Sequence, residues 1–128
     1  DVRHRPNVPK VIDEYRGGIH LAKLRLDGFV SMRGADENSF LDTRPLRIEG
    51  DKLVINGVAQ GEITAEITDP QGLHTLPGWG REDCHPVTGD QLSAELSWSG
   101  RDLSELAGKH VRIRFYLDNA DLYSFWVE

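Results

Sequence analysis

The sequence predicts an all-β fold, an antiparallel, jelly-roll-like β-sandwich of about eight strands. Short segments in which apolar and polar residues alternate recur along the chain, as expected for strands with one buried face. Turn-forming glycine, proline, asparagine and aspartate residues separate these segments. The patterns place strands at residues 19–26, 29–33, 40–48, 52–56, 61–69, 91–98, 110–117 and 122–127.

The chain is expected to form one domain, because 128 residues can bury roughly two thirds of the surface of the unfolded chain. Residues 1–18 contain two prolines, several charges and a Gly17-Gly18 pair, which favours a linker or a loosely packed lead-in. Residues 19–128 then form the β-sandwich. Its core is expected to include Leu24, Phe29, Ile48, Leu53, Ile63, Ile67, Leu96, Ile113, Phe115 and Phe125.

The connections between the strands carry explicit turn chemistry. Turns are expected at Asp27-Gly28, Glu49-Gly50-Asp51, Asn56-Gly57, residues 69–72 and Thr88-Gly89-Asp90. Asp102 can cap a single helical turn that runs to Ala107, and Gly108 stops it. Nothing else in the sequence resembles a helix.

The last strands are expected to pair as a β-hairpin, because residues 118–121 between them favour a turn. In the second strand of this hairpin, the side chains of Tyr123, Phe125 and Val127 lie on one face, which is expected to face the core. Leu122, Ser124 and Trp126 then face outward. The alternation therefore predicts an exposed surface for stacking and hydrogen bonding, made of Arg112, Arg114, Tyr116 and Trp126.

Residues 71–88 form the longest interval without a strand pattern, and loops of this length in compact domains are usually functional or ordered for a special reason. On the functional interpretation, Trp79 is a platform for a sugar, and Arg81, Glu82 and Asp83 supply hydrogen bonds. On the alternative interpretation, the loop crosses the sandwich and fills a gap in the core with Leu76, Trp79 and Cys84.

Composition excludes several function classes. No run of about 18 apolar residues could cross a membrane, and the net charge of −6 argues against nucleic acid or an anionic lipid surface. The single cysteine, Cys84, rules out an internal disulfide without fixing the compartment. No signal peptide is visible at Asp1, which says little about secretion in a chain of this kind.

Metal and cofactor sites have little support in the sequence. Cys84 and His85 are adjacent, so on an extended backbone their side chains point in opposite directions and cannot chelate zinc together. A calcium site has slightly more support, because the sequence contains side chains with the oxygen ligands that calcium prefers. The same side chains are explained more simply by turn formation, and we expect no cofactor. The oxygen ligands available to calcium are Asp36, Glu37, Asn38, Asp118, Asn119 and Asp121.

We expect the chain to be non-catalytic. Glycoside hydrolysis needs two carboxyl groups that face each other across a cleft, whereas Glu62, Glu66 and Glu95 have the spacing of solvated strand residues. The sequence lacks a Gly-x-Ser-x-Gly elbow, a His-Glu-x-x-His motif and a phosphate-binding loop.

The chain resembles a carboxy-terminal β-sandwich domain that follows a propeller catalytic domain in some secreted bacterial proteins. Those proteins are similar to glycoside hydrolase families 32 and 43 and to sialidases. The resemblance lies in four segments, residues 19–32, 78–84, 106–115 and 120–125. The resemblance implies a secreted or periplasmic bacterial accessory module beside a catalytic domain. It brings no catalytic residues to this chain. Trp79 and Trp126 depart from the pattern of those domains, which favours binding over packing alone.

Two functions remain open at this point. The first is a carbohydrate-binding module in which an indole stacks on a pyranose, and the expected ligand-binding residues are Trp126, Tyr116, Arg112, Arg114, Trp79, Arg81 and Glu82. An anionic glycan is preferred, because arginine forks bind a carboxylate or sulfate bidentately. The second is a structural interdomain β-sandwich that packs on a propeller and has no ligand of its own.

Overall fold

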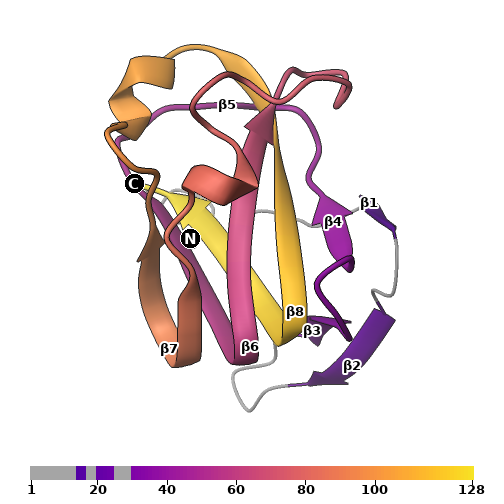
Figure 1. Cartoon of the computed structure of the whole chain (residues 1–128). Helices are drawn as coiled ribbons and strands as arrows, with labels where there is room; N and C mark the ends of the chain where they lie inside the picture. The colour runs from indigo at the N-terminus through magenta and orange to yellow at the C-terminus, as the bar shows by residue number, and fades with distance from the viewer. Residues whose placement is uncertain (1–13, 17–19, 25–29) are drawn as a thin grey trace, which may run out of the picture.

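The computed structural model describes residues 14–16, 20–24 and 30–128, and the side chains from Met32 onward. The described chain forms strands and two short 3-10 helices (Figure 1). The strands are β1 (Glu14–Arg16), β2 (His20–Leu24), β3 (Val30–Gly34), β4 (Phe40–Asp42), β5 (Leu46–Arg47), β6 (Leu53–Thr68), β7 (Val87–Leu96) and β8 (His110–Val127). The helices are η2 (Arg81–Asp83) and η3 (Leu103–Leu106).

The fold is an all-β antiparallel sandwich organised around β6 and β8. These two strands pair along their whole length, from Leu53 opposite Val127 to Thr68 opposite Arg112. Both bend at the same end of the molecule, so each contributes to both layers (Figure 1). In the first layer, residues 112–117 of β8 pair with residues 63–68 of β6. On its other side, β8 pairs with β4 at residues 114–116 and with β5 at residues 110–111, and β1 pairs with β4. In the second layer, residues 120–127 of β8 lie between β3 and residues 53–59 of β6, flanked by β2 and β7.

The predicted hairpin at the end of the chain is wrong. Residues 110–117 and 122–127 do not pair with each other, because β8 runs on through residues 118–121 and both halves pair with β6. The turn-forming residues instead make the bend: the register shifts there, and Asn119 has a left-handed backbone with φ of 48°. The chemistry of residues 118–121 therefore changes the layer to which the strand belongs without reversing the strand.

A second register shift, between Asn56 and Gly57 of β6, changes which side chains of residues 122–127 in β8 face the core. Leu122, predicted to face outward, is fully buried in the core cluster. Tyr123, predicted to enter the core, is buried but lies outside that cluster. Phe125 and Val127 occupy the core as expected, since they follow the irregularity.

The core lies between the two layers, where the rings of Phe115 and Phe125 meet with centroids 5.1 Å apart. Leu24 and Phe29 of the predicted core lie outside the residues whose side chains are described. The remaining predictions are confirmed, since these side chains are buried: Ile48, Leu53, Ile63, Ile67, Leu96, Ile113, Phe115 and Phe125.

Several element boundaries differ from the sequence prediction. The strand expected at residues 40–48 is broken into β4 and β5, and the strands expected at residues 52–56 and 61–69 are continuous in β6. Gly89 was expected in a turn but pairs with Ala59 inside β7. The capped turn at Asp102 is confirmed, because its carboxylate accepts from the backbone N–H of Ser104 at 3.0 Å. None of the described helices is long and apolar enough to span a membrane.

Candidate functional site

The outer face of the first layer gathers three of the predicted site residues. Arg112, Arg114 and Tyr116 are half-buried and alternate along β8 with fully or nearly fully buried side chains, as the pattern predicted. Two rows run across the sheet through this face. Asp42, Arg114 and Glu66 lie opposite one another on β4, β8 and β6, and the next row contains Phe40, Tyr116 and Thr64.

The first row is an ion-pair network centred on Arg114. Its guanidinium donates to both carboxylate oxygens of Asp42, from Nε at 2.7 Å and from Nη2 at 3.1 Å. Its Nη1 lies 3.6 Å from Oε1 of Glu66, and its Cζ lies 4.6 Å from the ring centroid of Phe40. The hydrogen bonds to Asp42 raise the pKa of Arg114 above its ordinary value. Arg114 is therefore held by the protein, and so is Arg112, whose Nε donates to the carbonyl of Pro70 at 2.9 Å.

The second row places Tyr116 beneath Arg81. The phenol hydroxyl donates to Oε1 of Glu66 at 2.8 Å, which fixes the ring on the sheet. The Cζ of Arg81 lies 4.0 Å from the centroid of that ring, a cation–π contact. Burial raises the pKa of Tyr116, and the hydrogen bond to Glu66 raises it further, so the hydroxyl remains a donor at neutral pH.

The loop that carries Arg81 is anchored on both sides of it. The backbone N–H of Ile67 donates to the carbonyl of Trp79, and the N–H of Leu76 donates to the carbonyl of Ile67, so the loop continues the edge of β6. Trp79 and Cys84 are buried in the core on either side of η2. These two buried side chains hold Arg81 and Glu82 over the outer face of the first layer.

A cleft of about 430 Å³ opens between this loop and β6. It is lined by Glu62, Thr64, Arg81, Glu82, Cys84 and Pro86. Thr64 is only 3% exposed, and its hydroxyl has no hydrogen-bond partner within the described part of the chain. A buried hydroxyl without a partner is costly, so Thr64 Oγ1 marks a position at which a ligand atom would gain a hydrogen bond.

The charged groups of the cleft are also available to a ligand. Arg81 has the ring of Tyr116 beneath it, and neither its guanidinium nor the carboxylates of Glu62 and Glu82 forms an ion pair or hydrogen bond with any other described residue. Gly80 leaves room for Glu82, since a Cβ at residue 80 would lie 2.4 Å from Glu82 Oε1. The cleft thus offers guanidinium donors, carboxylate acceptors and one hydroxyl, which β6 contributes.

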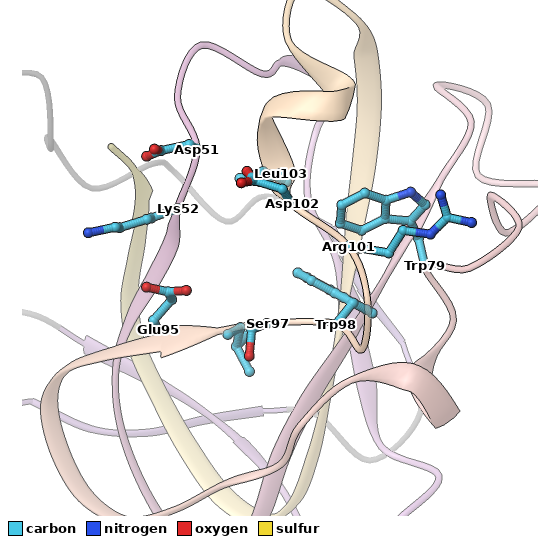
Figure 2. A pocket seen from close by; sticks show the side chains of 10 residues that line it. Asp51, Lys52, Trp79, Glu95, Ser97, Trp98, Arg101, Asp102 and Leu103 are labelled. Carbon is cyan, nitrogen blue, oxygen red and sulfur yellow. The ribbon is translucent and has the colours of Figure 1, made fainter.

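A smaller pocket of about 170 Å³ lies near η3 (Figure 2). Trp79 and Trp98 form its inner wall, with ring centroids 5.3 Å apart, and each is only 3% exposed. The ammonium of Lys52 and the guanidinium of Arg101 point away from its centre (Figure 2). The expectation that Trp79 is a sugar platform is wrong, because its indole is buried against Trp98. The alternative, in which Leu76, Trp79 and Cys84 fill the core beneath the loop, is confirmed.

Trp126 does not share a face with Tyr116, contrary to the sequence prediction. The prediction required a hairpin, whereas Trp126 lies in the second layer, opposite Val54 of β6. Since Phe115 and Phe125 meet between the layers, their neighbours Tyr116 and Trp126 belong to opposite outer surfaces. Trp126 is half-buried, and its indole N–H donates to Glu128 Oε2 at 3.2 Å.

Residues that could hold a metal are not gathered in the described structure, where no three His, Cys, Asp or Glu side chains are arranged for one. Among the acidic residues considered for calcium, Asp121 pairs with Arg33 at 3.2 Å. Asn119 accepts from the same guanidinium and donates to Gln60.

Two residues that complete the site, Glu66 and Thr64, were not predicted from the sequence. Glu66 was expected to be solvated, but it is buried and accepts from Tyr116 and from Thr75. Thr64 was not singled out. The alternation of residues 62, 64 and 66 with buried Ile63, Ala65 and Ile67 places all three on the outer face, and this signal was present in the sequence.

Comparisons with known proteins add a likeness of fold. No protein-family model matches the sequence, and no curated protein matches it. Among solved structures, the fold is similar to that of CsCBM6-3 from Clostridium stercorarium, a carbohydrate-binding module solved in complex with cellobiose. The TM-score is 0.54 at 12% sequence identity, over 91% of this chain and 86% of that one. This chain thus has a sandwich like that of a carbohydrate-binding module.

Proposed function

We propose that this chain is a non-catalytic carbohydrate-binding domain whose ligand occupies the cleft beside Arg81. The observation that carries the proposal is the convergence, in one cleft, of a buried hydroxyl on Thr64 that has no partner among the described residues and the guanidinium of Arg81, which lies over the ring of Tyr116. Polyhydroxylated ligands offer both donors and acceptors, and they match such a set of groups. The similarity of the fold to a module solved with cellobiose supports the same ligand class.

The wider setting belongs to the proposal as well. We propose that the domain accompanies a catalytic domain in a secreted or periplasmic bacterial protein that degrades glycans, as the sequence resemblance implies. Tethering raises the effective concentration of substrate, so an affinity in the millimolar range is useful to such an enzyme. The expectation of an anionic glycan rested on the forks of Arg112 and Arg114, and both are engaged with protein oxygens.

The burial of Trp79 favours the second candidate, a structural sandwich that packs on a propeller without a ligand. With that indole in the core, the side chains that were expected to stack on a sugar are reduced to Tyr116 and Trp126, and Tyr116 is covered by Arg81. Direct binding measurements separate the two candidates.

The experiment is affinity electrophoresis and calorimetry of the whole chain against neutral, uronic and sulfated polysaccharides. Arg81→Ala should weaken binding by about tenfold or more, because a charge-assisted hydrogen bond contributes about 1.5–3 kcal/mol. Arg47→Ala is the matched control, since Arg47 is largely exposed and outside the cleft. Trp126→Ala tests the original location of the site on the opposite surface. Binding that survives Arg81→Ala but not Trp126→Ala would move the site there, and the absence of any binding would favour the packing function.

A further inference from the structure

The charges of the cleft beside Arg81 are unequal. Glu62 and Glu82 contribute two carboxylates, whereas Arg81 contributes one guanidinium. Asp118 of β8 lies opposite Glu62, and further along β8 the guanidinium of Arg114 contacts Asp42 and Glu66. No further cation lines the cleft in the described structure. A ligand therefore meets a negative local charge.

The hydrogen-bonding capacity of these groups restricts the ligand further. Ionised carboxylates only accept, so groups near Glu62 and Glu82 must donate. The guanidinium of Arg81 only donates, while the Thr64 hydroxyl can do either. A sugar hydroxyl satisfies every one of these partners, because it both donates and accepts. A ligand carboxylate brings acceptors alone, and it would satisfy Arg81 while facing two carboxylates.

We propose that Glu62 and Glu82 make this site selective for neutral sugars and exclude uronic acids, with a ligand hydroxyl bonded to Thr64 Oγ1. This inference rests on the proposed function and reverses the preference for anionic glycans that the sequence suggested. Glu62 and Arg81 are half-buried, so solvent screens their interactions with a ligand charge only in part. Selection against a carboxylate should therefore weaken, but not disappear, as salt is added.

The test uses polysaccharide pairs that share their β-1,4 linkage and differ in oxidation at C6: mannan and mannuronan, and cellulose and C6-oxidised cellulose. In a pair whose neutral member binds, the uronic member should bind at least about tenfold more weakly, as expected for one uncompensated like-charge contact near a protein surface. Uronic binding as tight as neutral binding would overturn the inference and leave the proposed function intact. If no member of any pair binds, the proposed function fails, and the inference fails with it.

The double variant Glu62→Gln/Glu82→Gln should lose most of its discrimination against uronic polysaccharides, because Arg81 is then the one charged side chain among the described residues that line the cleft. Glu49→Gln/Glu95→Gln changes the net charge equally outside the cleft, and it should preserve the discrimination. If both double variants behave alike, net charge and not the cleft sets the preference, and the inference is wrong.

Thr64→Val and Thr64→Ser test the hydroxyl contact. Valine has nearly the same shape and lacks the hydroxyl, so Thr64→Val should bind the neutral member about fivefold or more weakly, whereas Thr64→Ser should retain binding. Thr64→Val should also fold at least as stably as the parent, since it removes a buried group without a partner. Unchanged sugar binding by Thr64→Val would overturn the Thr64 contact.

Discussion

Arg114 on β8 and Asp42 on β4 are joined by two hydrogen bonds, at 2.7 and 3.1 Å, in a pair whose carboxylate side is almost completely buried. The fork of the guanidinium matches the two oxygens of the carboxylate, which a lysine could not do. The pair ties the short strand β4 to the centre of the first layer. It also holds the row of side chains next to the cleft.

Arg114→Met should destabilise the protein by about 3–5 kcal/mol, because it leaves the Asp42 carboxylate buried without its partner. Urea denaturation followed by tryptophan fluorescence measures this change. Arg47→Met is the control: Arg47 is 58% exposed and lies 3.7 Å from Glu49, so its loss should change stability by less than about 1 kcal/mol. Equal effects of the two substitutions would contradict a structural role for the Arg114–Asp42 pair.

Trp79→Ala should cost about 3–5 kcal/mol of unfolding free energy, through lost burial and the cavity left beside Trp98. Leu73→Ala in the same loop should have little effect, because Leu73 is 75% exposed. Both free energies come from chemical denaturation. A Trp79→Ala variant as stable as the parent would show that the indole is not a core side chain.

The stability of the fold should depend on pH through Cys84. Burial raises the pKa of its thiol from 9.0 to about 11 in the folded state. The folded protein therefore holds the proton more tightly than the unfolded chain, so this contribution is complete below pH 9 and is lost as pH rises toward 11. The parent should lose about 1 kcal/mol more than Cys84→Ala between about pH 8 and about pH 10.

Denaturant titrations of parent and variant at each pH measure that difference, and the variant corrects for every other titrating group, Tyr116 included. Parallel pH profiles for the two proteins would contradict the prediction. A steeper loss in the variant would show that the sign is wrong.

The fold class could be predicted because alternation reports burial locally, residue by residue. It identified the outward phase of Arg112, Arg114 and Tyr116 correctly. Alternation could not identify which strands pair, because the turn-forming residues 118–121 are equally compatible with a hairpin turn and with a bend between layers. Trp126 was misplaced for this reason, because its predicted neighbours followed from the wrong pairing.

The site was predictable only in part. Arg81 and Tyr116 were both named as ligand-binding residues, but their stacking depends on how the long loop crosses β6, and this is a tertiary property. The alternation places Thr64 on the outer face of its strand, but a threonine there is usually solvated, so the sequence does not indicate that its hydroxyl is buried. Its importance comes from tertiary structure, because Thr64 lines the same cleft as Arg81 and its buried hydroxyl has no partner among the described residues.

The bend shared by β6 and β8 restricts how the molecule can move. In a sandwich of two separate sheets, the layers can slide or part while each hydrogen-bond ladder stays intact. Here the ladder between β6 and β8 passes from one layer into the other, so relative motion of the layers must break pairs near Asn119. Opening of the two layers is therefore coupled to loss of the central ladder, and backbone amides on both sides of the bend should exchange with solvent together.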